Sequence, residues 1–190
     1  MAIRIDLEVP LGVWNAVGFP AGDFDLNGTR VMLREATSAP RVSLVVAGSA
    51  IDPDVANLRS GEVDLVGAVA DDALGLVAVD HLMVRTRDAE TTLAALSRAF
   101  GATIDTDANG ERTVTVDGVR IDMVPTADLP VAAEVWGIAF RVTDIDAVAA
   151  RLGGDVLGAA KSARQAGQRV AVFRGAAALG VPTALIDLRG

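Results

Sequence analysis

The reactive side chains in this chain limit the chemistry open to it. The sequence has no cysteine and a single histidine, His81. Thiolate nucleophiles, disulfides and cysteine-bound metal clusters are therefore excluded. A Ser-His-Asp triad or a histidine-based metal site can be built only around His81. Other chemistry has to come from carboxylate, hydroxyl, amide or guanidinium groups.

Two carboxylates, Asp122 and Asp187, stand within otherwise apolar segments that have the character of strands. An unpaired carboxylate is expensive to bury, so each of them must be compensated. A structural ion pair with an arginine, exposure to solvent, a metal ion and direct contact with a ligand are the alternatives. The residue types alone leave all four open.

The residues around His81 form the clearest local pattern, AVDHLMVRTRDAETTLAALSRAFG (78–101). An apolar run predicts a strand that carries His81. Asp88 is then expected to cap the start of a helix, and Gly101 fits its C-terminus. The segment therefore predicts a strand followed directly by a helix.

Further strands are predicted after this helix, in three short segments: 102–106, 112–116 and 119–124. The pairs Asn109-Gly110 and Asp117-Gly118 tolerate the positive φ angles of tight hairpin turns. The last strands are therefore expected to pair antiparallel. The complete unit is β-α-β-β-β.

A second copy of this unit begins at VWGIAFRVTDIDAVAARLGG (135–154). Its residues 137–144 can be laid over residues 81–88 without a gap, so Asp144 is expected to cap a helix at 145–152. The closing strands are predicted at 168–173 and 183–188, so that IDL (186–188) falls where IDM (121–123) stands in the first copy. Internal duplication is the economical explanation.

The first 75 residues resemble degenerate fragments of the same unit. LNGTRVMLRE (26–35) matches VDGVRIDMVP (116–125) turn for turn, and residues 42–61 can be laid over the second copy with a helix starting near Pro53. We therefore predict a degenerate N-terminal portion and a C-terminal domain of two modules, with these bounds: 1–75 for the portion, 76–190 for the domain, and 77–126 and 134–190 for its modules.

Two copies opened by DHLMVRTRDAETTLAAL (80–96) and GIAFRVTDIDAVAARL (137–152) resemble the vicinal oxygen chelate superfamily of glyoxalases, bleomycin-resistance proteins and dioxygenases. VWNAVGFP (13–20) and SARQAGQRVAVFRG (162–175) are similar to uncharacterised bacterial glyoxalase-like proteins. The resemblance implies an α+β fold in which paired β-α-β-β-β modules form curved, mixed sheets with helices outside. A ferredoxin-like fold is the rival, and it would need a second helix before the strand at Val119.

The same resemblance implies a metal site at the cleft between the modules. In that superfamily a divalent metal is held by a His or Glu on the first strand and a Glu on the last strand of each module. Carried over, the ligands would be His81, Asp122 and Asp187, with Gly137 where the fourth would stand. Asp is one methylene shorter than the usual Glu. We therefore expect a degenerate site without a metal, and a divalent metal at the three remaining residues is the alternative.

Four residues form the predicted ligand-binding set. The repeat relates Arg85 to Arg141, and two guanidinium groups near one cleft would suit the carboxylate of an organic acid. Trp136 would add an aromatic wall beside Gly137, and His81 would line the same face. The plainer alternatives are that each arginine pairs with a nearby acid, that Trp136 is structural, and that His81 is a cleft-wall or core residue.

These predictions lead to three functional hypotheses. The first is a small-molecule binder that holds an organic or aromatic acid between its modules. The second is an enzyme, a divalent-metal lyase, isomerase or dioxygenase of the vicinal oxygen chelate type. The third is a cleft filled by the protein's own side chains, which would leave a role in assembly. The sequence does not decide whether the protein is an enzyme, or whether it is a monomer or a homodimer.

Bulk composition narrows the partners. The formal charge is -8, with 17 Lys and Arg among 25 Asp and Glu, so no basic stripe favours nucleic acid. The longest nearly apolar run, 42–51, is well short of the roughly 20 residues that cross a bilayer. The start MAIRIDLEVP has no secretory pattern, so we expect a cytoplasmic protein without a membrane partner.

Overall fold

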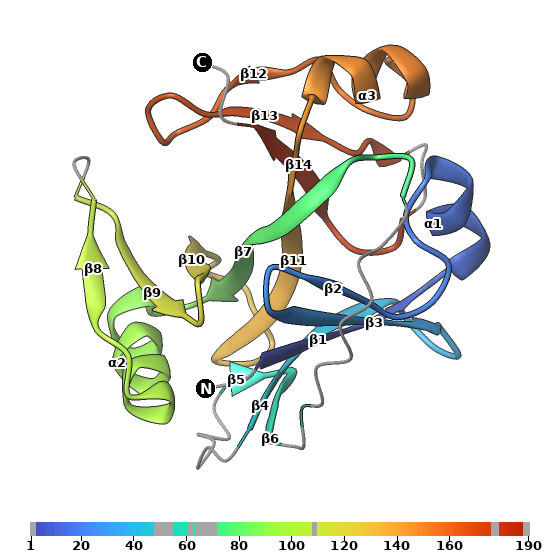
Figure 1. Ribbon diagram of the computed structural model, residues 1–190. Helices are drawn as coiled ribbons and strands as arrows, with labels where there is room; N and C mark the ends of the chain where they lie inside the picture. Colours follow the sequence, from blue (N-terminus) through green and yellow to red (C-terminus); the bar gives the residue numbers. More distant parts are fainter. Residues whose placement is uncertain are drawn as a thin grey trace.

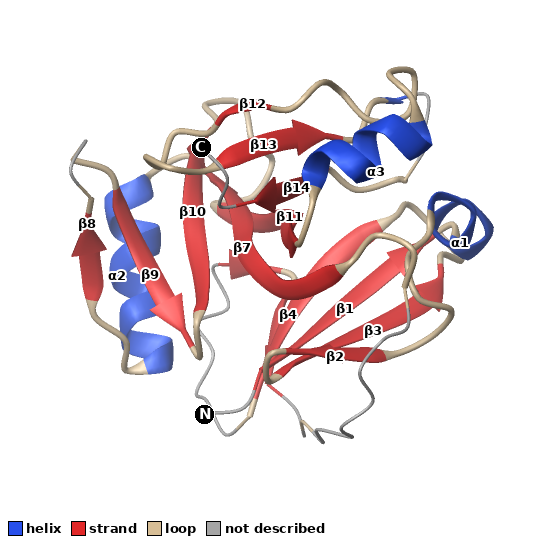
Figure 2. Ribbon diagram, turned by 45° about the horizontal axis from the view of Figure 1, so that its top comes forward, coloured by secondary structure: helices blue, strands red, loops and turns tan. Residues whose placement is uncertain are grey.

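The computed structural model describes residues 3–47, 55–60, 63, 72–107, 110–175 and 179–187. Its elements form two β-sheets with three α-helices among these residues (Figure 1). All but one short strand of the larger sheet come from the C-terminal part of the chain, and the smaller sheet lies beside it (Figures 1 and 2). The fold is therefore α+β, as predicted.

The larger sheet has nine strands, and its main path runs β12-β13-β14-β11-β7-β10-β9-β8. Its strands are β5 (Val55–Ala56), β7 (Leu76–Thr86), β8 (Ile104–Thr106), β9 (Arg112–Val116), β10 (Val119–Pro125), β11 (Ala133–Val142), β12 (Lys161–Ser162), β13 (Arg169–Val172) and β14 (Thr183–Asp187). The helices that belong to it are α2 (Ala89–Phe100) and α3 (Ile145–Leu152).

Two β-α-β-β-β modules account for eight of these nine strands, β7-α2-β8-β9-β10 and β11-α3-β12-β13-β14, and the ninth strand, β5, adds to β11. In each module the last strand pairs parallel with the first, and β7 pairs antiparallel with β11 to join the modules. No helix lies between α2 and β10 among the described residues, so the ferredoxin-like rival does not apply.

Both module helices begin where the sequence predicts. The Asp88 carboxylate accepts a hydrogen bond from the Thr91 backbone N–H, and the Asp144 carboxylate accepts from two N–H groups of α3. Gly101 ends α2 with φ of 61°, a left-handed conformation that glycine adopts without steric cost. The N-cap predictions are confirmed.

The smaller sheet has the order β2-β3-β1-β4-β6. Its strands and helix are β1 (Ile3–Val9), α1 (Leu11–Val17), β2 (Phe24–Leu26), β3 (Thr29–Glu35), β4 (Arg41–Val46) and β6 (Leu58–Ser60). β3 pairs parallel with β1, β4 pairs antiparallel with β1, and β6 pairs parallel with β4. These pairings repeat, in shortened form, the way in which β10 and β11 pair with β7.

The hairpins support the sequence match between the two sheets. Asn27 and Gly28 join β2 to β3 with φ of 47° and 85°, and Asp117 and Gly118 join β9 to β10 with φ of 46° and 82°. Two consecutive positive φ values are typical of a two-residue hairpin turn. The helix predicted near Pro53 is wrong over residues 55–60, which form β5 and β6. Pro53 itself lies outside the described residues.

The core is shared by both sheets. One hydrophobic cluster extends from Ile3 to Leu185. Within it the fully buried Trp14 of α1 donates a hydrogen bond from Nε1 to the Leu179 carbonyl at 2.8 Å and lies 4.2 Å from the Phe19 ring. The boundary at residue 75 remains a prediction, because the two parts pack as neighbours. None of the described helices has the length and apolarity that crossing a membrane requires.

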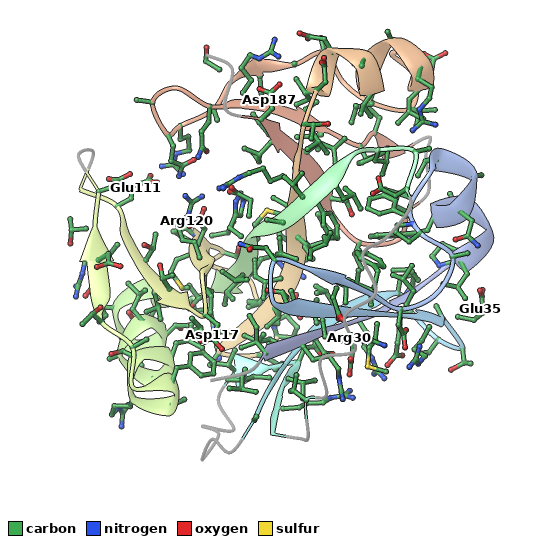
Figure 3. All side chains as sticks on the ribbon, in the orientation of Figure 1. Arg30, Glu35, Glu111, Asp117, Arg120 and Asp187 are labelled. Atoms are coloured by element: carbon green, nitrogen blue, oxygen red, sulfur yellow. The ribbon has the colours of Figure 1, made fainter. Side chains whose placement is uncertain are left out.

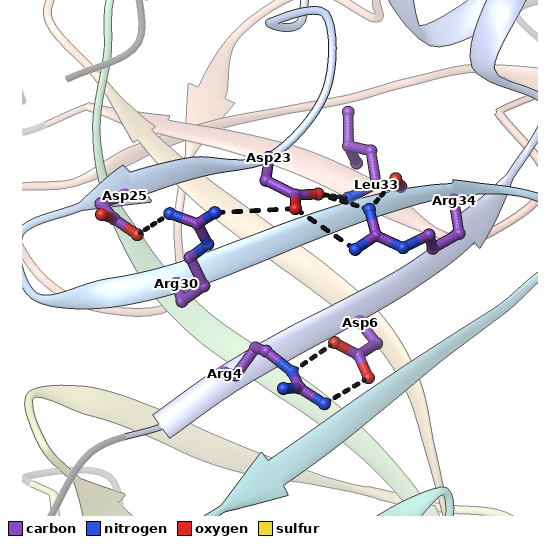
Figure 4. Close-up of polar contacts among 7 residues, drawn as sticks. All are labelled: Arg4, Asp6, Asp23, Asp25, Arg30, Leu33 and Arg34. Carbon is purple, nitrogen blue, oxygen red and sulfur yellow. Dashed lines mark hydrogen bonds and ion pairs between the residues drawn. The ribbon is translucent and has the colours of Figure 1, made fainter. Parts of the chain in front are cut away.

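Charged side chains cover part of the smaller sheet (Figure 4). Arg4 bonds Asp6 within β1, and Arg30 of β3 reaches Asp25 of β2 at 3.2 Å. Arg34 continues the row by bonding Asp23. The charges on this face balance one another, so it does not form a basic or acidic patch.

Candidate functional site

A cleft of about 460 Å³ lies between the two modules. From the first module it is lined by residues of β7, α2, β9 and β10, and from the second by residues of β13, β14 and the loop before β13. Its volume lies within the range of small-molecule sites. An ion pair between Glu111 and Arg164 links the two modules at this cleft. The predicted hollow between the modules is therefore present.

His81 lies on the wall of this cleft, and Asp80 orients its ring. The His81 Nδ1 atom is 2.9 Å from Asp80 Oδ2. Asp80 is 5% exposed and also accepts from Arg141 Nε at 3.2 Å. Since Asp80 is an acceptor only, its contact favours a proton on His81 Nδ1 and leaves the lone pair on Nε2. Arg120 Nη2 lies 3.2 Å from the same Nδ1 atom. With a proton on Nδ1, this nitrogen cannot accept a hydrogen bond from Arg120.

Burial alone would raise the pKa of Asp80, because it disfavours the charged carboxylate. Hydrogen bonds from His81 and Arg141, together with the charge of Arg141, outweigh burial and lower this pKa to about 2. Asp80 is therefore ionised at neutral pH.

Asp122 lies in the same cleft, where predicted, but it is already paired. Arg120 donates from Nε to Asp122 Oδ1 at 2.6 Å and from Nη2 to Oδ2 at 2.9 Å. The His81 Nε2 atom is 3.8 Å from Asp122 Oδ2. Both groups are thus near each other, with Arg120 holding the carboxylate.

Asp187 does not join them. Ile186 faces the cleft, and the following residue of a strand points to the opposite face of the sheet. There the Asp187 carboxylate accepts from Arg169 Nη2 at 2.8 Å and from the backbone N–H of Ile145 at 3.3 Å. Figure 3 shows Asp187 beside β14 and α3, and Arg120 beside β10. Asp187 anchors the start of α3 and does not face His81.

The reason is the register of the last strands. Asp122 stands opposite Met83 on β7, whereas the residue of β14 opposite Ala139 is Ala184. If Gly137 matches His81, Ala139 matches Met83 and Ala184 is the counterpart of Asp122. Laying IDL over IDM was therefore wrong by three residues, and an odd shift moves a side chain to the other face.

The predicted metal set does not assemble. Within the described part of the chain, no three His, Asp or Glu side chains come close enough to hold a metal ion. His81 and Asp122 are two potential ligands, but Arg120 already bonds both oxygens of Asp122, and Asp187 faces away. These residues do not fit a resident divalent metal.

The space at Gly137 is also filled. A Cβ atom there would come within 2.7 Å of the Met83 methyl group and 2.8 Å of the Pro182 carbonyl oxygen. The position predicted to offer room for a flat ligand therefore has no room for even one more carbon. Met83 and the chain before β14 close this part of the cleft wall.

Arg85 and Arg141 do not form a clamp. Because β7 and β11 run antiparallel, Arg85 lies opposite Glu134 near one end of the pair and Arg141 lies opposite Ala78 near the other. Arg85 bonds Glu134, and Arg141 bonds Asp80. The repeat relates the two arginines in sequence, and the antiparallel pairing separates them in space.

A second hollow, of about 440 Å³, lies where the smaller sheet meets β11. Arg85 and Trp136 line this hollow, and the Arg85 Cζ atom lies 5.0 Å from the centre of the Trp136 ring. Arg41 of β4 lines it from the smaller sheet. The predicted ligand-binding residues are thus divided: His81 lines the cleft between modules, and Arg85 and Trp136 line another site.

Two residues of the cleft network were missed in the sequence, Asp80 and Arg120. Strand alternation places Asp80 on the face opposite His81. A β-bulge reverses this, because His81 stands opposite Ala139 whereas Val79 stands opposite Phe140, so Asp80 is an extra residue. The adjacency of an acid to the only histidine was the available signal.

The comparisons with known proteins identify similar folds. No protein-family model matches the sequence, and no curated protein matches it. A methylmalonyl-CoA epimerase from Mycobacterium tuberculosis has a TM-score of 0.50 at 18% identity, over 62% of this chain and 92% of that one. A Streptomyces coelicolor methylmalonyl-CoA epimerase with bound 2-nitronate-propionyl-CoA has 0.44 at 22%, over 60% and 99%. A hypothetical protein from Bacillus halodurans has 0.46 at 12%, over 59% and 94%.

The likeness to the mycobacterial structure shows the fold. Methylmalonyl-CoA epimerases belong to the vicinal oxygen chelate superfamily, so the predicted resemblance holds for the architecture. This chain has a glyoxalase-like α+β fold. At 18% identity the likeness says nothing of substrate or reaction.

Proposed function

We propose that the protein binds a small organic molecule in the cleft between its modules, with His81 as the polar group that contacts it. The observation that carries this proposal is the position of the His81 ring, held by buried Asp80 on the wall of a cleft of about 460 Å³. A fixed imidazole in a largely apolar cleft is typical of a site that orients one polar group of a ligand.

The charges of the cleft favour a neutral ligand. Its ion pairs are Glu90 with Arg112, Glu111 with Arg164, and Asp122 with Arg120. Counting only residues that line the cleft, three carboxylates face two guanidinium groups. An organic acid would therefore meet a lining with an excess of negative charge among the described residues, whereas a hydroxyl or N–H group can donate a hydrogen bond to the lone pair on His81 Nε2.

A second candidate function is proton transfer, as in an isomerase. The Asp80–His81 contact is the geometry that holds an imidazole as a general base, with Nε2 as the atom that would take the proton. This function needs no metal. If a carbon acid that binds the cleft exchanges a C–H proton for solvent deuterium, and His81→Asn abolishes this exchange, proton transfer would be supported. A bound ligand without exchange would leave binding as the function.

A thermal-shift screen of small neutral alcohols and amides, which carry a hydrogen-bond donor for His81 Nε2, tests the binding proposal. Compounds that bind the native cleft should raise the melting temperature of the wild-type protein. Val170→Phe, which fills the cleft, should abolish the response. Val172→Phe is the matched control, because Val172 lies on the same strand but outside the cleft lining and is 48% exposed. Equal responses in the two variants, or no stabilising compound at all, would contradict the proposal.

A further inference from the structure

The second hollow, where β4 and β11 approach each other, has the features of a separate ligand site. Polar walls come from Ser38, Arg41, Asn57, Arg85 and Glu134, and apolar walls come from Pro40, Val42, Trp136, Val181 and Pro182. No residue of this hollow lines the cleft that contains His81. What binds here is therefore independent of the proposed function.

Two arginines in this hollow have unused hydrogen-bond donors. Arg85 bonds Glu134, and Arg41 bonds Glu8, each through Nη2. The Nε atoms of Arg41 and Arg85 are shielded from solvent and have no hydrogen-bond partner among the described residues. A shielded donor without an acceptor costs free energy, and a guanidinium group has five N–H donors in all.

Both guanidinium groups are also accessible in part. The Arg41 side chain is 41% exposed and the Arg85 side chain is 32% exposed. Arg41 pairs with Glu8 and Arg85 with Glu134, so the charges balance, but each pair uses only part of its guanidinium group. A carboxylate that enters the hollow would supply acceptors for the remaining N–H groups of the two partly exposed guanidinium groups.

The apolar walls indicate what the carboxylate is attached to. Trp136 is the extra residue of a β-bulge in β11, which lies between Val135 and Gly137 in the pairing with β7. Its ring is half-buried beneath Arg85, and Pro40 and Pro182 lie along the same hollow. Rings and prolines offer flat apolar surface to a planar group.

We infer that this hollow is a binding site for a monocarboxylate with a flat apolar body, held by the guanidinium groups of Arg41 and Arg85. The donors come from both sheets, Arg41 on β4 and Arg85 on β7. Binding would therefore tie the smaller sheet to the larger one. This places the acid that the sequence predicts away from the cleft between the modules.

Benzoate is the probe, with neutral benzamide and ringless acetate as controls. Benzoate should raise the melting temperature of the protein clearly more than either control does. Arg41→Lys and Arg85→Lys keep the charge but lose the planar donors, so each should weaken benzoate binding by about tenfold or more in calorimetry. Arg34→Lys, a paired arginine outside the hollow, should bind benzoate as wild type does.

His81→Asn separates this site from the cleft, since it should leave benzoate binding unchanged. Arg41→Lys, at an exposed side chain, keeps the test valid if Arg85→Lys folds poorly. The inference would be overturned by no response to benzoate, by equal responses to benzoate and benzamide, or by a wild-type affinity in a folded Arg41→Lys protein. Loss of benzoate binding in His81→Asn would place the acid in the cleft and would overturn it too.

Discussion

Among single residues, Asp80 has the largest influence on the site. It is the buried carboxylate that joins His81 to Arg141, and it reaches them because it is the extra residue of a β-bulge in β7. Replacing the carboxylate by an amide removes the charge and leaves one acceptor oxygen for the Arg141 guanidinium and the His81 N–H together. Both stability and the ring position of His81 therefore depend on it.

Asp80→Asn should lower the free energy of unfolding by about 2 kcal/mol, because two hydrogen bonds to a charged, buried group weaken together. Urea denaturation at neutral pH measures this loss. Asp122→Asn is the matched control, since its ion pair is about a quarter exposed and should cost about 1 kcal/mol or less. A smaller loss for Asp80→Asn than for Asp122→Asn would contradict the assignment.

The stability contributed by Asp80 should depend on pH in one direction. Its pKa in the folded protein is about 2, below the ordinary value of 3.8. The unfolded chain therefore takes up the proton first as the pH falls. The contribution, about 2 kcal/mol, is complete above about pH 5 and is lost as the pH falls toward 2. The stability difference between wild type and Asp80→Asn, measured in urea, should shrink over this window and stay constant at higher pH.

The sequence predicts part of the site at this scale. The single histidine lies in the cleft, as expected from strand alternation in β7, and Asp122 lies there as the family resemblance implied. Asp80 could not be found in that way, because a bulge reverses the alternation at one residue. Asp187 was misplaced for a related reason: a shift of three residues in β14 cannot be seen in a short motif such as IDL.

The elements themselves follow the sequence closely. Helices capped by Asp88 and Asp144, and hairpins closed by Asn27-Gly28 and Asp117-Gly118, have local signals that act within a few residues. The short helix α1 was not predicted, because its seven residues include an early glycine and its N-cap residue, Pro10, makes no side-chain capping bond. Pairing of β5 with β11 is a long-range contact with no local signal.

The close packing of β11 against the chain before β14 gives an element-scale prediction. Gly137→Ala should lower the free energy of unfolding by about 1–3 kcal/mol, because the new methyl group would overlap the Met83 methyl group and the Pro182 carbonyl. Chemical denaturation measures the change. Gly154→Ala is the control, since a Cβ atom there meets no other atom within 4 Å. A Gly137→Ala protein as stable as Gly154→Ala would show that this space is open.

At the scale of the whole molecule, the two sheets share one hydrophobic cluster, and Trp14 of α1 and Arg151 of α3 both bond backbone carbonyls of the other part. Burial of this common core couples the folding of one sheet to that of the other. The protein should therefore unfold in a single step. Near-ultraviolet and far-ultraviolet circular dichroism should give the same transition midpoint, and two separate midpoints would show that the parts fold independently.

The site at the cleft is also a property of the whole molecule, because neither module alone encloses it. The chain has one histidine, so its imidazole gives one set of resonances in NMR. A neutral compound that stabilises the protein should shift the His81 resonances in the wild type and in Val172→Phe, and leave them unchanged in Val170→Phe. Stabilisation of the wild type without movement of the His81 resonances would contradict the claim that this cleft binds the ligand.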